Sequence, residues 1–276
     1  RGLVVENITA DFTYTKKNIL LEQLEMKTPS SEMKGRVELK YNRKDFSDFN
    51  NKVIFDVQFD KATIASNDLN YFYNEFGKNN VFYVDTHLVG TLNNFTTHNL
   101  KLVDKNQSEI VGTANFRNLF GKGNQEFYMK GNFDRITSNY EDLKSILPRI
   151  LGSNLPSVLS KLGNVNIAGD VELTQKYINA NVTMLSQLGY LEGNLAMQNI
   201  NNIDNASYQG NIKLDAFDLG TLLSQNDIGK ASLDLDVDGK GFTQKLLNTA
   251  IKGKIEKFYY NGYNYQNITV DGSMKM

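Results

Sequence analysis

The chain has 276 residues, 40% of them hydrophobic and 22% charged, so it can form one large folded domain or two smaller ones and is not disordered. Its 30 basic and 31 acidic residues leave a net charge of −1, which excludes the basic surface of a nucleic-acid-binding protein. The absence of Cys excludes a disulfide scaffold and thiol chemistry, and no apolar run reaches the roughly 18 residues of a membrane-spanning helix.

The first half of the chain alternates apolar and polar residues, a pattern that predicts strands with one apolar face. Between residues 33 and 41, for example, Val37 and Leu39 share one face while Glu38 and Lys40 lie on the other. On this basis we expect strands over residues 3–14 (as one strand or two), 19–28, 33–41, 53–59, 81–92, 95–103, 108–116 and 125–133.

Two stretches depart from this alternation and predict helices. Residues 67–77 repeat apolar residues at intervals of three and four, with Asn67 as the expected N-cap and Gly77 as the expected C-cap. Residues 139–162 carry a helical apolar stripe that Pro148 should kink or split. We interpret 139–162 as an amphipathic lid on the apolar face, because its polar side lacks the Lys and Arg typical of a membrane-surface helix.

The second half of the chain repeats the strand pattern more regularly. Strands are expected over 166–173, 177–184, 190–197, 208–216, 231–241, 246–260 and 263–276, with one helical turn at 219–223. Asn261-Gly262 is a strong β-hairpin signal. Because the connections are short, we expect an antiparallel meander of about fifteen strands. Both ends of the chain fall in strand-like sequence, so we expect a piece of a longer protein.

Glycines recur on the apolar faces of these strands, among them Gly35, Gly169 and Gly210. An interior glycine weakens a strand but lets a sheet bend. Two interpretations remain open: the apolar face closes as the core of a sandwich, or the sheet curls into an open trough whose lining can bind a ligand. We favour the trough, because the apolar faces mix small and large residues and the chain has no Trp. The predicted fold is therefore a mainly β, long antiparallel meander curled into an open hydrophobic trough, with short helical insertions near 67–77 and 139–162.

Four stretches carry a family resemblance: residues 217–242 (FDLGTLLSQNDIGKASLDLDVDGKGF), 251–275 (IKGKIEKFYYNGYNYQNITVDGSMK), 24–41 (LEMKTPSSEMKGRVELKY) and 67–77 (NDLNYFYNEFG). They resemble the TamB family, the inner-membrane subunit of the translocation and assembly module, which is related to AsmA-like proteins. The resemblance implies a trough called a β-taco, located in the periplasm and anchored in the inner membrane by a segment outside this chain. It also implies an outer-membrane β-barrel partner, met through parts outside this chain. The implied roles are phospholipid transport to the outer membrane and help with barrel-protein assembly.

We therefore expect a hydrophobic conduit for phospholipid acyl chains, with no enzymatic activity and no cofactor. The alternative is a scaffold whose exposed strand edge pairs with client strands during barrel assembly. A third class, a carbohydrate enzyme or lectin, is less favoured because Tyr259, Tyr260, Tyr263 and Tyr265 flank a turn without a carboxylate pair. The expected lipid-binding residues lie on the apolar faces: Val37, Leu39, Phe55, Val57, Leu88, Phe127, Met129, Ile167, Val171, Leu195, Ile212, Leu214, Leu233, Leu235, Val237, Ile251, Ile255, Ile268 and Val270.

Two polar features are interpreted as ordinary surface rather than as sites. Asp234, Asp236 and Asp238 alternate along one strand, which spaces them about 7 Å apart and does not gather the six to eight oxygens that Ca²⁺ requires. The only two histidines, His87 and His98, are expected on adjacent strands, where they could meet, and we interpret them as lone surface residues. No metal site is expected.

Overall fold

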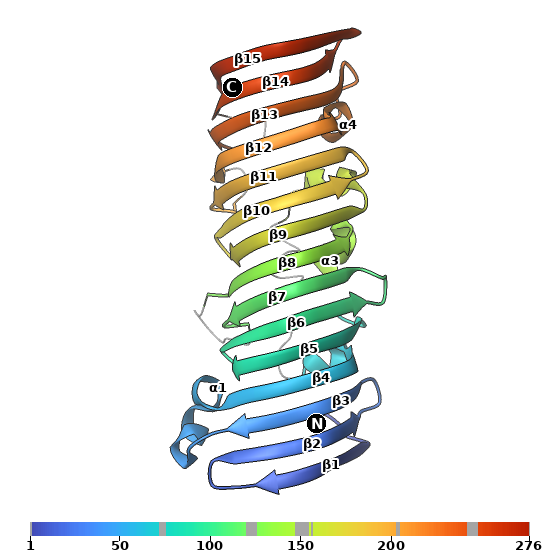
Figure 1. Cartoon of the computed structure of the whole chain (residues 1–276), viewed down its shortest axis with the longest axis vertical. Helices are drawn as coiled ribbons and strands as arrows, with labels where there is room; N and C mark the ends of the chain where they lie inside the picture. Colours follow the sequence, from blue (N-terminus) through green and yellow to red (C-terminus); the bar gives the residue numbers. More distant parts are fainter. Residues whose placement is uncertain are drawn as a thin grey trace. The chain divides into compact units, whose positions relative to one another are not determined.

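The structure is a computed structural model that describes residues 2–71, 76–119, 126–146, 155, 157–202, 205–241 and 248–275. Its strands form one open antiparallel sheet in which each strand pairs with the next along the chain (Figure 1). The strands are β1 (Asn7–Tyr14), β2 (Asn18–Lys27), β3 (Glu32–Lys40), β4 (Ile54–Ala65), β5 (Val81–Thr91), β6 (Asn94–Asp104), β7 (Glu109–Arg117), β8 (Tyr128–Ser138), β9 (Val165–Thr174), β10 (Tyr177–Ser186), β11 (Gly189–Gln198), β12 (Ser207–Asp218), β13 (Ile228–Lys240), β14 (Asn248–Tyr260) and β15 (Tyr263–Lys275). The predicted antiparallel meander is confirmed.

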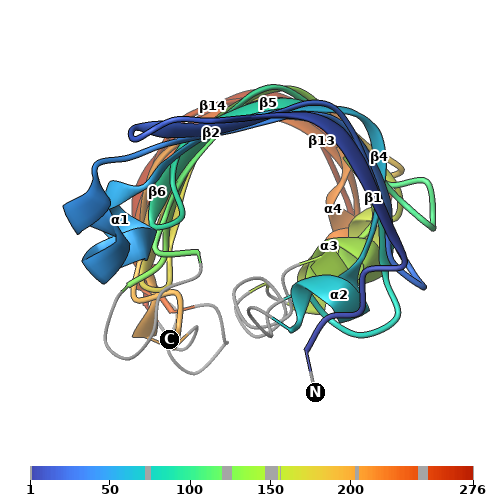
Figure 2. The same ribbon diagram turned by 90° about the horizontal axis from the view of Figure 1, so that it is seen from below.

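The chain divides into two compact units. Unit 1 consists of Arg1–Phe133 with Ser145–Arg149, and unit 2 of Asp134–Lys144 with Ile150–Met276. In both units the strands bend along their length, as β2 and β5 do in unit 1 and β13 and β14 do in unit 2 (Figure 2). Among the described residues, strands contact chiefly their hydrogen-bonded neighbours. No second sheet therefore packs on the apolar face within either described unit, which favours the trough over the sandwich.

Irregular backbone positions account for the bends. The pairing register shifts between Leu21 and Leu24, where Gln23 has a φ of 50°, and between Leu214 and Phe217, where Ala216 has a φ of 46°. Each shift inserts extra residues into one strand, as in a β-bulge, and such an insertion turns the strand and increases its twist.

Glycine allows a close approach between two strands. Gly210 of β12 has a φ of +147°, and a Cβ added there would overlap the carbonyl oxygen of Asn194 on β11. Only glycine fits such a backbone, because every other residue carries a Cβ. The structure therefore requires glycine at this position, and the link between glycine and curvature stays a prediction.

The helical segments are short. They are η1 (Arg43–Asp48), α1 (Phe49–Lys52), α2 (Ser66–Leu69), α3 (Tyr140–Ile146), η2 (Ser157–Leu162) and α4 (Leu219–Leu223). The helical turn expected at 219–223 is confirmed as α4. Asn261-Gly262 does form the β14–β15 turn, with φ values of 48° and 84°.

The prediction for 67–77 was partly wrong. The helix α2 begins at Ser66 after the N-cap Ala65 and has Asn70 as its C-cap. Asn67 is not the N-cap; its side-chain oxygen instead accepts a hydrogen bond from the Asn79 N–H at 3.1 Å. Residues 72–75 lie outside the described residues, as do 147–154 with Pro148, so the expected kink in 139–162 stays a prediction.

Candidate functional site

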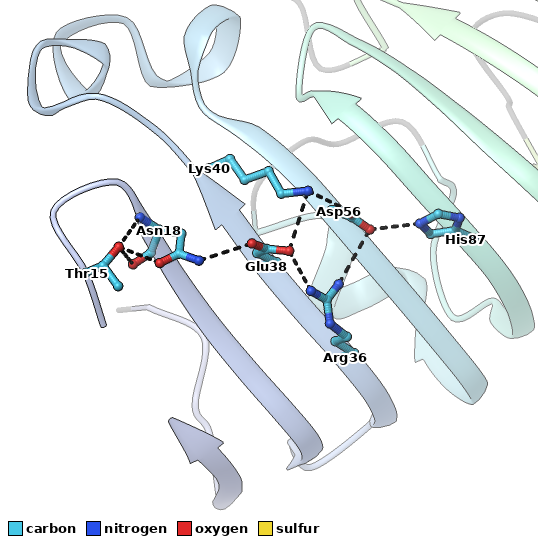
Figure 3. Close-up of polar contacts among 7 residues, drawn as sticks. All are labelled: Thr15, Asn18, Arg36, Glu38, Lys40, Asp56 and His87. Carbon is cyan, nitrogen blue, oxygen red and sulfur yellow. Dashed lines mark hydrogen bonds and ion pairs between the residues drawn. The ribbon is translucent and has the colours of Figure 1, made fainter. Parts of the chain in front are cut away.

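The polar face of unit 1 carries a network of charged side chains on β3, β4 and β5 (Figure 3). Asp56 accepts a hydrogen bond from Lys40 Nζ at 2.9 Å and contacts His87 Nε2 at 2.8 Å. Glu38 accepts from Asn18 Nδ2 at 3.1 Å and pairs with Arg36 at 2.5 Å. Every charge therefore meets an opposite one, and the network leaves no carboxylate poised for acid–base chemistry.

These contacts also fix the protonation of the two carboxyl groups. The hydrogen bonds from Lys40 and then His87 hold the pKa of Asp56 below its ordinary value. The hydrogen bonds from Asn18 and then Arg36 do the same for the pKa of Glu38. Contact with Asp56 raises the pKa of Lys40. Asp56, Glu38 and Lys40 are thus charged near neutral pH, which suits a stabilising surface.

The two histidines lie at the surface as predicted, but they are not isolated from each other. His87 and His98 stand directly opposite each other on β5 and β6, and their ring centroids are 5.9 Å apart. The sequence placed them on adjacent strands, but their meeting depends on the register, which the register shift between Asp85 and His87 helps to set. In the described part of the chain, no group of three or more His, Cys, Asp or Glu side chains is arranged to hold a metal ion.

The alternating aspartates of β13 lie exposed on the polar face, as expected. The Asn211 Nδ2 donates to Asp234 Oδ1 at 2.9 Å and to Asp236 Oδ1 at 3.1 Å. An amide that donates to both carboxylates occupies the space between them, so these aspartates act as partners of Asn211 on the neighbouring strand.

The apolar face of unit 2 is ordered into three rows that cross the strands β9–β15. Following the paired residues from strand to strand gives the first row as Ile167, Met184, Leu191, Leu214, Leu233, Ile255 and Ile268; the second as Gly169, Val182, Gly193, Ile212, Leu235, Gly253 and Val270; and the third as Val171, Ala180, Leu195, Gly210, Val237, Ile251 and Gly272. No position in the three rows carries a polar or charged side chain.

The rows bring together every expected lipid-binding residue between Ile167 and Val270. All nineteen expected residues of the chain are buried or partly buried, and none is exposed. Sequence reasoning missed Met184, Leu191 and Val182, which lie in the same rows. Their alternation within 177–184 and 190–197 was visible, and it would have identified them.

Short helical segments cover one side of the apolar face, chiefly over the first row. Leu214 and Leu233 are buried in a cluster with Leu162 of η2, and Leu219 and Leu222 of α4 pack against it. Figure 2 shows α4 on the inner side of the bent strands, so the apolar face of unit 2 is the concave one. Lys161 of η2 joins the two segments by donating to the Leu222 carbonyl oxygen at 2.7 Å.

The rest of the face is less enclosed. Val171, Leu195, Ile251 and Val270 are only partly buried and lie outside that cluster. The described residues of unit 2 therefore combine a covered side of the apolar face with an apolar stretch that remains accessible.

Unit 1 carries a similar apolar face on a smaller scale. Val37, Val57 and Leu88 pair across β3, β4 and β5, and Leu39 pairs with Phe55 in the next row. The Phe55 ring meets that of Phe49 from α1, with centroids 5.7 Å apart.

Two threonines continue this face without leaving a polar group unsatisfied. Thr86 Oγ1 donates to the His98 carbonyl oxygen at 3.0 Å, and Thr97 Oγ1 donates to that of Ala114 at 3.1 Å. Of the other two expected residues, Phe127 is buried just before β8 and Met129 is partly buried in it.

Comparisons of the chain with models of known protein families, with curated proteins and with solved structures found no match. Among the described residues, no helix is both long enough and apolar enough to span a membrane.

Proposed function

We propose that this chain is a segment of a periplasmic hydrophobic conduit that carries phospholipid between the inner and outer membranes. The single observation that supports this proposal is the set of three apolar rows across β9–β15, which contain no polar side chain. The periplasmic location, the inner-membrane anchor and the outer-membrane barrel partner come from the resemblance to the TamB family and belong to the same proposal.

The dimensions of the rows suit an acyl chain. Neighbouring strands are about 4.8 Å apart, so seven strands span about 29 Å along each row. This length is close to the roughly 30 Å hydrocarbon core of a bilayer, which holds two layers of acyl chains. An acyl chain laid along a row would therefore contact the apolar face of the sheet over its whole length.

The chemistry of the rows suits movement rather than fixed binding. Burial of each methylene group contributes about 0.8 kcal/mol wherever along the row it occurs. A polar anchor would favour one position of the ligand over the others, and the rows offer none. An acyl chain would therefore be retained on the face but free to slide.

A scaffold for assembly of outer-membrane barrel proteins is the second candidate, and the exposed apolar side chains of β1 favour it. Ile8 and Phe12 on this strand are 55% and 64% exposed, and the strand contains no proline. An exposed apolar strand can pair through its backbone with a strand of another protein.

The test compares a charge on each face of the sheet. Val171→Asp places a carboxylate in the third row, and Asn181→Asp places one on the exposed polar face of the neighbouring strand as a matched control. Lipid extraction and mass spectrometry of gently purified protein should find phospholipid with the unmodified chain and with Asn181→Asp, and little or none with Val171→Asp.

Other outcomes of the same measurement are equally informative. A lipid-free unmodified chain that captures unfolded barrel strands would support the scaffold and contradict the conduit. In cells that depend on this protein, Val171→Asp should weaken the outer-membrane barrier, and an intact barrier would also contradict the conduit.

A further inference from the structure

The only two histidines of the chain face each other on the polar face of unit 1. His87 of β5 and His98 of β6 are directly paired across the two strands, and their ring centroids are 5.9 Å apart. The His87 side chain is 39% exposed, and His98 is exposed as well. Two imidazoles, the side chains that most commonly bind transition metals, are therefore adjacent and open to solvent.

The contact with Asp56 determines which nitrogen of His87 can bind a metal ion. Asp56 Oδ1 lies 2.8 Å from His87 Nε2, and Figure 3 shows the other ring nitrogen farther from Asp56. Because the Asp56 carboxylate is ionised near neutral pH, it only accepts hydrogen bonds, so Nε2 carries the proton and donates it. In a neutral imidazole, Nδ1 then keeps the lone pair that a metal ion requires.

We propose that His87 and His98 together bind a divalent transition-metal ion, Zn²⁺ or Cu²⁺, on the polar face of unit 1. A histidine nitrogen lies about 2.0–2.1 Å from a bound Zn²⁺. The ring centroids of two imidazoles on one ion are then about 4.5 Å apart for a right angle at the metal and about 6.4 Å apart for a straight line. The observed 5.9 Å falls within this range, so the two strands need not move.

The site has two protein ligands, and water molecules complete the coordination of the ion. This agrees with the described part of the chain, where no group of three or more His, Cys, Asp or Glu side chains is arranged to hold a metal ion. Structural zinc sites have four protein ligands, and catalytic ones have three. We therefore expect binding that is weaker than in those sites and that exchanges readily with solvent.

Asp56 acts as an outer partner of the site. A carboxylate that accepts a hydrogen bond from the second N–H of a metal-binding histidine fixes the orientation of the ring and makes its other nitrogen more basic. Asp56 is itself held by Lys40, whose Nζ donates to Asp56 Oδ2 at 2.9 Å. The charged network of β3 and β4 therefore orients one of the two ligands in advance.

The charges beside the pair are compatible with a bound cation. Asp85 lies two residues before His87, and so on the same face, where it stands opposite Lys101 of β6. Lys101 Nζ contacts Glu109 Oε1 at 3.5 Å. Because this lysine is paired with a carboxylate, as Lys40 is with Asp56, the two basic side chains repel an incoming cation less than unpaired ones would.

Zinc titration of the full chain without a polyhistidine tag tests this proposal. Isothermal titration calorimetry at neutral pH should show one Zn²⁺ bound per chain. Cu²⁺ should bind more tightly than Zn²⁺, as the usual order of metal affinities requires. Mg²⁺, which prefers oxygen ligands, should not bind. The electron paramagnetic resonance spectrum of the Cu²⁺-loaded chain should show hyperfine coupling to imidazole nitrogen.

Three variants separate the histidine pair from the acidic residues. His98→Gln removes one ligand at an exposed position and should abolish the one-to-one binding of Zn²⁺ while the circular dichroism spectrum stays unchanged. Asp56→Asn keeps both histidines and should weaken Zn²⁺ binding about tenfold. Asp234→Asn with Asp236→Asn, on the polar face of unit 2, is the control and should leave Zn²⁺ binding as it is.

The proposal is overturned if the unmodified chain binds no Zn²⁺, or if His98→Gln binds it as tightly as the unmodified chain does. It is also overturned if the control variant of β13 loses the binding, which would assign the ion to the aspartates. Acid pH gives a further check, because protons compete with a metal ion for imidazole nitrogen. Zn²⁺ binding should therefore weaken as the pH falls, and binding that persists in acid would contradict the histidine pair.

Discussion

Gly210 offers the sharpest test of how this sheet bends. It lies in the third row with a φ of +147°, and a Cβ added there would overlap the Asn194 carbonyl oxygen. In Gly210→Ala, the backbone strain of a non-glycine residue costs about 1–3 kcal/mol. Relief of the overlap by separation of β11 from β12 adds about 1–3 kcal/mol, the range for overpacking. We expect the free energy of unfolding to fall by about 2–6 kcal/mol in total.

Gly272→Ala is the matched control, because it makes the same substitution in the same row. Gly272 has no atom within 4 Å of an added Cβ, and its φ lies outside the range reserved for glycine. Its substitution should change stability by at most about 0.5–1 kcal/mol, with stabilisation expected from the lower entropy of the unfolded chain. Urea unfolding followed by far-UV circular dichroism measures both, since the chain has no Trp to report by fluorescence.

The comparison between the two variants tests whether the glycine backbone sets the curvature of the sheet. If Gly210→Ala and Gly272→Ala unfold at the same urea concentration, the glycine backbone does not set the curvature. In that case the bulges alone would account for the bends. Hydrogen exchange localises the effect: the amides that join β11 and β12 should lose protection in Gly210→Ala, while those that join β14 and β15 should not.

The remaining predictions concern the charged network and the covered side of the apolar face. The pKa values of Asp56 and Glu38 are held below their ordinary ones, so the folded chain binds fewer protons than the unfolded chain in acid. The contribution of these two carboxylates to the stability of the folded chain is therefore complete above about pH 4.5. It is lost as the pH falls through their pKa values in the folded chain. Asp56→Asn should therefore flatten the acid limb of a plot of unfolding free energy against pH, and an unchanged limb would show that other groups dominate. Lys161→Met should remove the hydrogen bond to the Leu222 carbonyl, at a cost of about 1–3 kcal/mol, and faster hydrogen exchange in α4 would report it. Phe217→Ala removes a side chain that is 1% exposed and should destabilise unit 2 by about 3–5 kcal/mol, measured by thermal unfolding. Leu223→Ala, at a position that is 50% exposed, is the control and should have little effect in the same measurement.

Strand positions and faces could be predicted from the sequence because alternation is a local signal. Val37, Val57 and Leu88 were each assigned to an apolar face from their immediate neighbours alone. The structure then shows that they pair across β3, β4 and β5. The hairpin at Asn261-Gly262 was predictable for the same reason, since both residues readily adopt positive φ.

Features that depend on register could not be predicted. Gln23 and Ala216 occupy register shifts with positive φ, and neither residue type signals such a backbone. The contact of Asp56 with His87 joins strands whose alignment is set by these irregularities and by the connecting segments. The short helical pair η1 and α1 was also missed, although Asn42 and Asp45 carry the spacing of a capping box and form one in the structure.

Whether the backbone or the packing of side chains sets the curvature decides how exposed the apolar face can be. Where curvature comes from positions such as Gly210 and from bulges, the side chains of the rows need not interlock to hold the bend. A sandwich core requires such interlocking, and its side chains tolerate little change in volume. A face whose shape is set by the backbone can remain partly exposed, as Ile251 and Val270 are, without loss of the fold. Volume-reducing changes at these two positions, such as Ile251→Val, should therefore lower the free energy of unfolding less than comparable changes at Leu233 under η2 and α4. That difference would distinguish a ligand-binding surface from a packed core.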